Sequence, residues 1–198
     1  MQLYLSATSP FGRICLICAL LRQRNDILLN FVNPWENPAE LAEQNPFGQI
    51  PVLQTDEGPV IYNTHLICQY LHNDTPSAED LAVSGYAVSL LDNTIQALKL
   101  VRFKTENSDD HPLVDRCFNA VKRALPQAPA FDASTTNWPQ IMLGIVLLTV
   151  KLRYPELFSQ HARPDTADTV AQFEQRDFIR QTDPAALERK PATVGDVL

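Results

Sequence analysis

Along roughly the first seventy residues, short apolar runs alternate with segments whose apolar residues are spaced as in a helix. A few consecutive apolar residues predict a strand, whereas apolar residues three or four positions apart predict an amphipathic helix. On these rules we expect strands at 1–5, 27–32, 52–55 and 59–62. We expect helices at 10–22, 39–44 and 64–71, with Pro10 well suited to the first helical position.

The order of these elements indicates the kind of domain. The first two strands are separated by a helix, which predicts a right-handed crossover between them. The turn signal Asp56-Glu57-Gly58 predicts a hairpin, and its second strand tolerates a proline because it lies at the sheet edge. Strand, helix, strand, helix, strand, strand, helix is the order of a thioredoxin-like α/β domain.

The pattern changes at the polar segment 72–77, which indicates a linker. Beyond it no strand pattern survives, and helices are expected at 78–105, 112–125, 138–154 and 166–176. Asn137 is placed to cap the third of these helices, with Gln140 as its capping-box partner. The chain should therefore consist of a thioredoxin-like domain at 1–75 and an all-helical domain at 78–198.

Composition and charge restrict the function classes. Apolar residues make up 45% of the 198 residues and charged residues 20%, as in an ordinary globular protein. The formal net charge is −7 and no basic block occurs, which disfavours nucleic acid or an anionic membrane as a partner. There is no signal-peptide pattern, and the most apolar run, 141–150, is too short to cross a bilayer. We therefore expect a cytoplasmic protein.

Four cysteines occur, two of them in the pattern Cys15-Leu16-Ile17-Cys18. A C-x-x-C pattern can be a dithiol redox centre, which needs its first thiol at a helix N-terminus, where the pKa is lowered. Both cysteines lie more than a turn inside the expected helix, so the pattern favours packing of small side chains against the sheet. The four histidines show no metal-ligand spacing, and we expect no metal site.

Several short motifs occur in a fixed order along the chain. The first domain contains Ser9-Pro10-Phe11-x-Arg13, the segment Asn45-Pro46-Phe47-Gly48-Gln49-Ile50-Pro51-Val52-Leu53, and Asn63-Thr64 at a helix start. The second contains Ile141-x-x-Gly144, the run 153–157 and the closing segment 173–184. In order and spacing these motifs resemble the glutathione S-transferases, in particular bacterial members with serine at the first helix. The resemblance covers nearly the whole chain, and it implies glutathione as co-substrate.

Ser9 is the expected catalytic residue. It lies between the first strand and the first helix, where backbone N–H groups and the helix dipole favour a negative charge. A hydroxyl there can donate to a thiolate, lower the pKa of the thiol and so make it a nucleophile near neutral pH. Ser9 could instead serve only as a helix N-cap, and Ser6 and Thr8 are nearby hydroxyls that could replace it.

The resemblance assigns binding of the peptide to Gln49, Ile50-Pro51, Asn63 and Thr64. A cis Ile50-Pro51 bond would expose the backbone N–H and C=O of Ile50 to an extended ligand; the alternative is an ordinary trans proline. Gln49 could reach a carboxylate or amide of the ligand. Asn63 and Thr64 would hold its γ-glutamyl end, or only cap a helix. Asn63 departs from the acidic residue or glutamine that is usual in the family.

Phe11 could line the site of the second substrate or pack under the first helix. The resemblance implies a homodimeric detoxification enzyme that conjugates the thiolate of glutathione to small, largely apolar electrophiles. Two other functions stay open. One is a non-catalytic binding or scaffold protein, which Asn63 favours. The other is a glutathione-dependent peroxidase or reductase, which the serine at position 9 disfavours, since it is not a cysteine.

Overall fold

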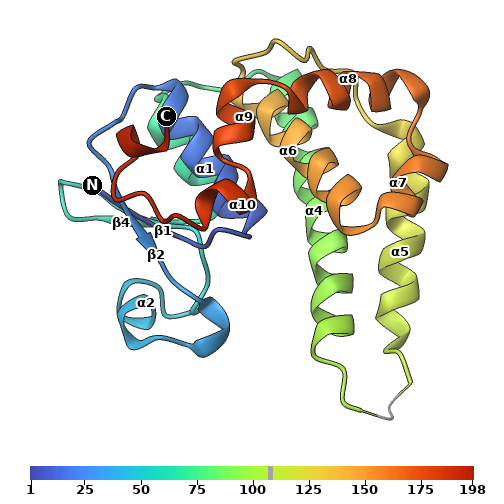
Figure 1. The fold of residues 1–198 in the computed structure, drawn as a ribbon, viewed down its shortest axis with the longest axis horizontal. Coiled ribbons are helices and arrows are strands. Elements are labelled where there is room, and N and C mark those ends of the chain that lie inside the picture. The colour runs from blue at the N-terminus through green and yellow to red at the C-terminus, as the bar shows by residue number, and fades with distance from the viewer. Residues whose placement is uncertain (107–108) are drawn as a thin grey trace. The chain divides into compact units, whose positions relative to one another are not determined.

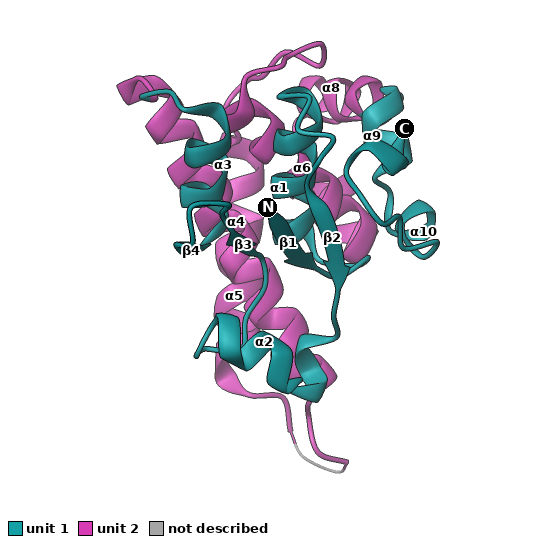
Figure 2. Ribbon diagram, turned by 90° about the vertical axis from the view of Figure 1, so that its left-hand side faces the viewer, with its two compact units in different colours: residues 1–75, 174–198 teal, residues 76–173 magenta. Residues whose placement is uncertain are grey.

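The computed structural model describes residues 1–106 and 109–198. Contacts divide the chain into two compact units, shown in different colours in Figure 2. Unit 1 contains Met1–Thr75 and Glu174–Leu198, and unit 2 contains Pro76–Phe173. Residues 174–198, which are expected in the helical domain, group with the first unit by their contacts. Among the described residues, no helix has the length and apolarity needed to span a membrane.

Unit 1 is built on a mixed sheet of four strands (Figure 1), and their order, β2-β1-β3-β4, can be followed by the labels in Figure 2. The strands are β1 (Gln2–Leu5), β2 (Leu28–Phe31), β3 (Val52–Gln54) and β4 (Val60–Tyr62). β1 and β2 are parallel, whereas β3 is antiparallel to both β1 and β4. The helices along this part of the chain are α1 (Pro10–Leu21), α2 (Ala39–Gln44) and α3 (Thr64–His72). The thioredoxin-like order and the edge hairpin are thereby confirmed, and so is a crossover through α1 between two parallel strands.

The alternation along β1 separates the two faces of the sheet. Leu3 and Leu5 are fully buried, and a Cβ on Gly12 of α1 would lie only 2.8 Å from the Cβ of Leu5. Leu5 therefore faces α1. Tyr4 points to the opposite face, where it belongs to an apolar cluster with Leu41 of α2. The sheet thus lies between α1 on one face and α2 on the other.

The buried Arg13 ties α1 to the end of the chain. Its Nη2 donates to the carbonyl of Ile179 at 2.6 Å, and its Nε donates to the hydroxyl of Thr182 at 3.4 Å. Burial lowers the pKa of Arg13 to about 10, and the charge of Asp183 opposes that shift. The guanidinium is still charged at neutral pH, so these are charge-assisted bonds. They explain why the residues after α8 belong to unit 1.

The last residues of the chain cover the open edge of β2. The N–H of Leu29 donates to the carbonyl of Ala192 at 2.8 Å, and the N–H of Val194 donates to the carbonyl of Ile27 at 2.9 Å. Such pairing protects an edge strand from association with other chains. Neither this segment nor the short helices before it, α9 (Asp177–Gln181) and α10 (Pro184–Leu187), are expected from the sequence pattern.

Unit 2 is helical, as the sequence predicts. Its helices are α4 (Ala78–Arg102), α5 (Pro112–Ala124), α6 (Trp138–Arg153), α7 (Pro155–His161) and most of α8 (Pro164–Glu174). The described residues also form three 3-10 turns, η2 (Leu125–Gln127) in unit 2 and η1 (Pro34–Glu36) and η3 (Gly195–Val197) in unit 1. α6 is buried along nearly its whole length, which agrees with its apolar sequence. α7 is not expected from the sequence pattern; it begins at Pro155, directly after the expected end of α6.

The expected capping box of α6 is only half formed. Asn137 caps the helix, since its Oδ1 accepts from the N–H of Gln140 at 3.2 Å. The reciprocal bond is absent because the side chain of Gln140 accepts from the N–H of Asp132 instead, at 3.2 Å. The prediction of Gln140 as a capping-box partner was therefore wrong. A complete capping box opens α4, formed by Ser77 and Asp80.

Close packing explains the glycine at position 144. A Cβ there would lie 2.5 Å from Cε1 of Phe173, whose side chain is fully buried. A buried ring has little room to move aside, so an added methyl group would overpack the core. Gly85 of α4 is the useful comparison, because a Cβ there would meet no atom within 4 Å.

We expect Gly144→Ala to lower the free energy of unfolding by about 2 kcal/mol, because it overpacks the ring of Phe173. The melting temperature should fall by roughly 4–8 °C in calorimetry. Gly85→Ala is the matched control and should stabilise the protein by about 0.5–1 kcal/mol through helix propensity. Equal effects of the two substitutions would contradict the packing argument.

Candidate functional site

The register of the sheet brings the predicted site residues to one end of it. Tyr4 of β1 is opposite Val52 of β3, and Val52 is opposite Tyr62 of β4. The end of β1, the start of β3 and the end of β4 therefore lie side by side. The segments attached at these points are the ones that carry Ser9, Gln49 to Pro51, and Asn63-Thr64.

Ser9 is the N-cap of α1. Its Oγ accepts from the backbone N–H of Gly12 at 3.2 Å, and its backbone is extended, with φ of −82° and ψ of 115°. This bond uses a lone pair of the hydroxyl oxygen, so the O–H proton stays available to a ligand atom. Capping and ligand binding are thus compatible at this residue. Of the nearby hydroxyls, Thr8 is exposed and Ser6 is half-buried.

The first turn of α1 offers a further donor beside Ser9. Pro10 has no N–H, and the N–H of Gly12 is satisfied by Ser9. The N–H of Phe11 is one of the groups that have no partner within a helix. The side chain of Phe11 is half-buried. Whether this ring lines the site of a second substrate stays a prediction.

The Ile50-Pro51 bond is cis, which confirms that expectation. Pro51 is buried, and the side chain of Ile50 packs against the apolar cluster that includes Tyr4 and Leu41. Among the described residues, neither the N–H nor the C=O of Ile50 has a hydrogen-bond partner. Gln49 is exposed. A donor, an acceptor and a long polar side chain are therefore presented together before β3.

Asn45 holds this loop in place, which the sequence analysis missed. Its side chain is 1% exposed; Nδ2 donates to the carbonyl of Gln49 at 2.8 Å, and Oδ1 accepts from the N–H of Phe47 at 3.1 Å. Gly48 adopts φ of 60°, in the left-handed region that glycine tolerates. The Asn-Pro-Phe-Gly sequence was a turn signal that could have indicated this role.

Asn63 and Thr64 open α3. Asn63 is exposed, has φ of 90°, and caps the helix because its Oδ1 accepts from the N–H of His65 at 3.0 Å. Its Nδ2 group and the second lone pair of Oδ1 are not used by this bond. Thr64 is the first residue of the helix, so its N–H belongs to the unsatisfied first turn.

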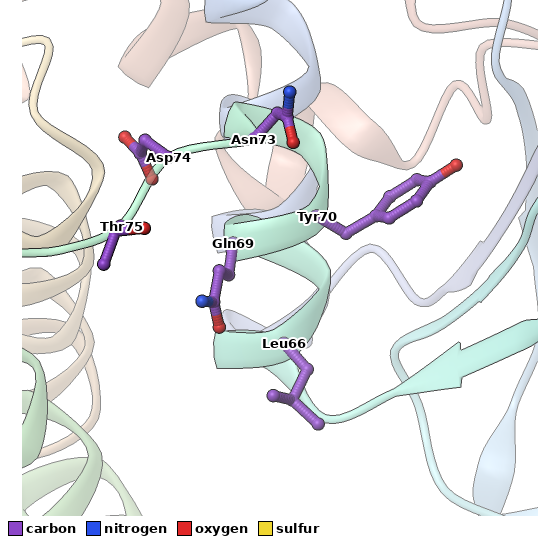
Figure 3. A pocket seen from close by; sticks show the side chains of 6 residues that line it. All are labelled: Leu66, Gln69, Tyr70, Asn73, Asp74 and Thr75. Carbon is purple, nitrogen blue, oxygen red and sulfur yellow. The ribbon is translucent and has the colours of Figure 1, made fainter.

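Two surface pockets among the described residues of unit 1 lie elsewhere. The larger, of about 410 Å³, is formed by the later part of α3 and the residues that follow it (Figure 3). The other, of about 330 Å³, lies over β1 and β2 and is bordered by Glu40 and Lys190. Neither is lined by a predicted site residue.

The cysteines do not form a redox centre at a helix start. Cys15, Cys18 and Cys68 are fully buried and Cys117 is 2% exposed, all as free thiols. Burial raises the pKa of Cys15, Cys18 and Cys68, which is the opposite of what a reactive thiol requires. Among the residues that the structure describes, no group of three metal-ligating side chains is placed to hold an ion.

The N-terminal part of the chain matches a known family. Residues 8–74 match the family model of the glutathione S-transferase N-terminal domain. No curated protein matches the chain.

Solved structures are similar over almost the whole chain. A glutathione transferase family member from Pseudomonas fluorescens Pf-5 with bound glutathione has a TM-score of 0.83 and 21% identity, over 92% of this chain and 98% of that one. A glutathione S-transferase from Methylobacillus flagellatus KT with glutathione bound has a TM-score of 0.78 and 24% identity, over 92% and 98%. One from Methylobacterium radiotolerans in complex with glutathione sulfonate has 0.75 and 20%, over 92% and 94%.

A thioredoxin-like sheet followed by a helical domain is thus the fold of the whole chain. Residues 8–74 therefore carry a glutathione S-transferase N-terminal domain, and the whole chain has the fold of these solved glutathione S-transferase structures.

We expect Asn45→Asp to lower the free energy of unfolding by about 2–4 kcal/mol at neutral pH, because a buried carboxylate oxygen would face the carbonyl of Gln49. Burial raises the pKa of such a carboxyl in the folded state above that in the unfolded state. The loss should therefore be full above the folded pKa and diminish as the pH falls through it. Urea denaturation at several pH values measures both effects.

The control is Asn93→Asp. The Nδ2 of Asn93 also donates to a backbone carbonyl, that of Ser89, at the same 2.8 Å, but in an exposed place. There the change should cost less than about 1 kcal/mol. A similar cost at both positions would contradict the role given to Asn45.

Proposed function

We propose that the chain binds glutathione at the end of the sheet and transfers its thiolate to small electrophiles. The observation that carries this proposal is the arrangement there of unused hydrogen-bonding groups on three segments. They are the Ser9 hydroxyl, the backbone N–H and C=O of Ile50, and the N–H of Thr64. The bound glutathione and glutathione sulfonate of the similar structures support the choice of ligand.

Each group has a part of the tripeptide suited to it. Ile50 would pair with the ligand backbone as a neighbouring strand does. The N–H and hydroxyl of Thr64, at the positive end of a helix, would hold the γ-glutamyl carboxylate. Gln49 would reach an amide or carboxylate of the ligand, and Asn63 would contact its amino end. The sulfur would then lie toward Ser9.

The chemistry proposed for Ser9 is stabilisation of a thiolate. A free thiol titrates near pH ~8.5, so only a small part is ionised at neutral pH. A hydroxyl that donates to the sulfur favours the charged form, and the thiol proton passes to solvent. The thiolate then attacks an electrophilic carbon, a C–S bond forms, and the leaving group departs with the electron pair of its broken bond. A role in detoxification would follow from this reaction.

Asn63 gives a reason to consider a non-catalytic binding protein as well. A ligand ammonium group needs an acceptor, and the Oδ1 of Asn63 already accepts from the N–H of His65. One lone pair is left, on a side chain that is shorter than the glutamine usual at this place. With one acceptor site left, Asn63 would hold the amino end of glutathione weakly, which suits a binding protein. A thiol reductase is not supported, because all four cysteines are buried.

We expect Ser9→Ala to lower turnover of an aromatic halide by about 10–100-fold near neutral pH, because a hydrogen bond to a charged group contributes about 1.5–3 kcal/mol. Affinity for glutathione should change less than about threefold, since Ile50 and Thr64 hold the peptide. The pH profile of kcat/KM should shift upward by roughly 1–2 units as the thiol pKa rises. Rates of the two proteins should converge at high pH.

The control separates the loss of the cap from the loss of the donor. Ser77→Ala removes another helix N-cap, in unit 2, and should cost a similar ~1 kcal/mol of stability while leaving the pH profile unchanged. An unchanged rate in Ser9→Ala would move the catalytic role to Ser6, Thr8 or the N–H of Phe11. The whole proposal would be contradicted if the unmodified protein showed no retention on immobilised glutathione and no turnover.

We also propose a homodimer, which exposed apolar side chains of unit 1 support. Phe47 is 68% exposed and stacks edge-on with Tyr62, with ring centroids 5.9 Å apart. Leu66 and Tyr70 of the neighbouring α3 are also exposed. Aromatic groups of this kind are frequent anchors of protein interfaces.

We expect Phe47→Ser to raise the dimer dissociation constant at least about tenfold, because an anchoring aromatic contributes more than about 1.4 kcal/mol. Sedimentation equilibrium measures it. Trp35→Ser is the control, a 46% exposed aromatic in η1 of the same unit. A monomeric protein, or equal effects of both substitutions, would contradict the interface.

A further inference from the structure

Three of the four cysteines meet between α1 and α3. The sulfur atoms of Cys18 and Cys68 lie 3.1 Å apart, with the Cys18 thiol donating to the sulfur of Cys68. Neither side chain has any exposed surface. Cys15, about one turn earlier on α1, directs its thiol to the carbonyl of Thr64 at 3.8 Å. Cys15 also interacts with the thiol of Cys68, but the sulfur–sulfur contact of 3.1 Å joins Cys18 and Cys68, one from each helix.

We propose that Cys18 and Cys68 are a site of oxidative modification, at which an intrachain disulfide joins α1 to α3. An S–S bond is about 2.05 Å long, so the two sulfur atoms need to approach by only about 1 Å. Small side-chain rotations on two packed helices supply such a movement. Cys15 and Cys18, three positions apart on one helix, are not in such close sulfur–sulfur contact. Cys117 belongs to the other unit.

The oxidant is a small peroxide, hydrogen peroxide being the simplest. The sulfur of one thiol attacks a peroxide oxygen, the O–O bond breaks, and a sulfenic acid and water are formed. The sulfur of the second thiol attacks the sulfenic sulfur, an S–S bond forms and a second water leaves. Overall, two thiols and one hydrogen peroxide give one disulfide and two waters. The two electrons lost by the sulfurs reduce the peroxide.

Burial determines how this site behaves. It raises the pKa of both thiols, so the reaction is slower than at an exposed thiolate and requires brief opening between the helices. The same burial keeps a reductant as large as glutathione from the bond once it has formed. The site therefore responds to sustained oxidation by a small molecule and is restored slowly.

The bond closes a loop that contains most of the sheet. Residues 19–67 include β2, α2, β3 and β4, so the crosslink removes a large part of the freedom of the unfolded chain. It joins α1 and α3 about as they already lie. Ser9 caps α1 and Thr64 begins α3, so oxidation stiffens the frame of the proposed ligand site.

The test treats the folded protein with hydrogen peroxide and counts free thiols after denaturation. We expect the count to fall from four to two. Mass spectrometry of a digest should show a peptide that contains Cys18 joined to one that contains Cys68, and dithiothreitol should release it. The melting temperature of the oxidised protein should rise by roughly 5–15 °C. These readouts do not involve glutathione, so they are independent of the proposed function.

Variants show which cysteines take part. Cys15→Ala and Cys117→Ala should keep the crosslink and the thermal shift, whereas Cys18→Ala and Cys68→Ala should each abolish both. The unmodified protein alone decides the matter if a variant fails to fold. Four persisting thiols, a crosslink through Cys15, sulfinic acid as the only product, or a crosslink formed only in denaturant would each overturn the proposal.

Discussion

The antiparallel pairing of β1 with β3 is the constraint on which the proposed site depends. It sets Tyr4 opposite Val52, and the β3–β4 hairpin sets Val52 opposite Tyr62. Three connections that are distant in the sequence therefore meet at one end of the sheet. A shift of one residue in this register would also turn Leu3 and Leu5 from the α1 face to the α2 face, so burial of the core fixes the register. The apolar core and the polar site are consequences of the same pairing.

The groups at this end of the sheet serve the fold and the proposed ligand together. Ser9 and Asn63 are both helix N-caps whose side chains accept one backbone hydrogen bond. Each retains hydrogen-bonding capacity that the cap does not use. Helix starts are therefore a natural place for an anionic ligand, since their unsatisfied N–H groups need partners. The cost is that stability and binding change together when such a residue is replaced. For this reason the substitutions need controls at caps far from the site.

Much of the fold follows from local patterns in the sequence. The apolar runs predict all four strands, and helical spacing predicts α1 to α6 within a few residues, because each signal comes from a single segment. The cis Ile50-Pro51 bond was expected only through the family resemblance, since nothing in the local sequence requires it. The placement of Ser9 at a helix start follows from Pro10 beside it.

What the sequence did not show depends on contacts between distant residues. Arg13 belongs to the motif that begins at Ser9, but the sequence does not show that its partners are Ile179 and Thr182. The segment along β2 has no strand pattern of its own and is extended because β2 offers it hydrogen-bonding groups. The C-x-x-C pattern drew attention to the wrong pair, because the thiol contact of Cys18 is with Cys68 on another helix. Likewise, the Gln140 side chain accepts from the N–H of Asp132 and does not complete the capping box of α6.

The most direct test of the site is a map of backbone amide chemical shifts during titration with glutathione. The account predicts the largest saturable changes at the amides of Phe11, Ile50 and Thr64, all at one end of the sheet. Changes confined to the later part of α3 around Asn73, or to the pocket over β1 and β2 around Asn30, would place the ligand in one of those two pockets. Either result would contradict the central claim.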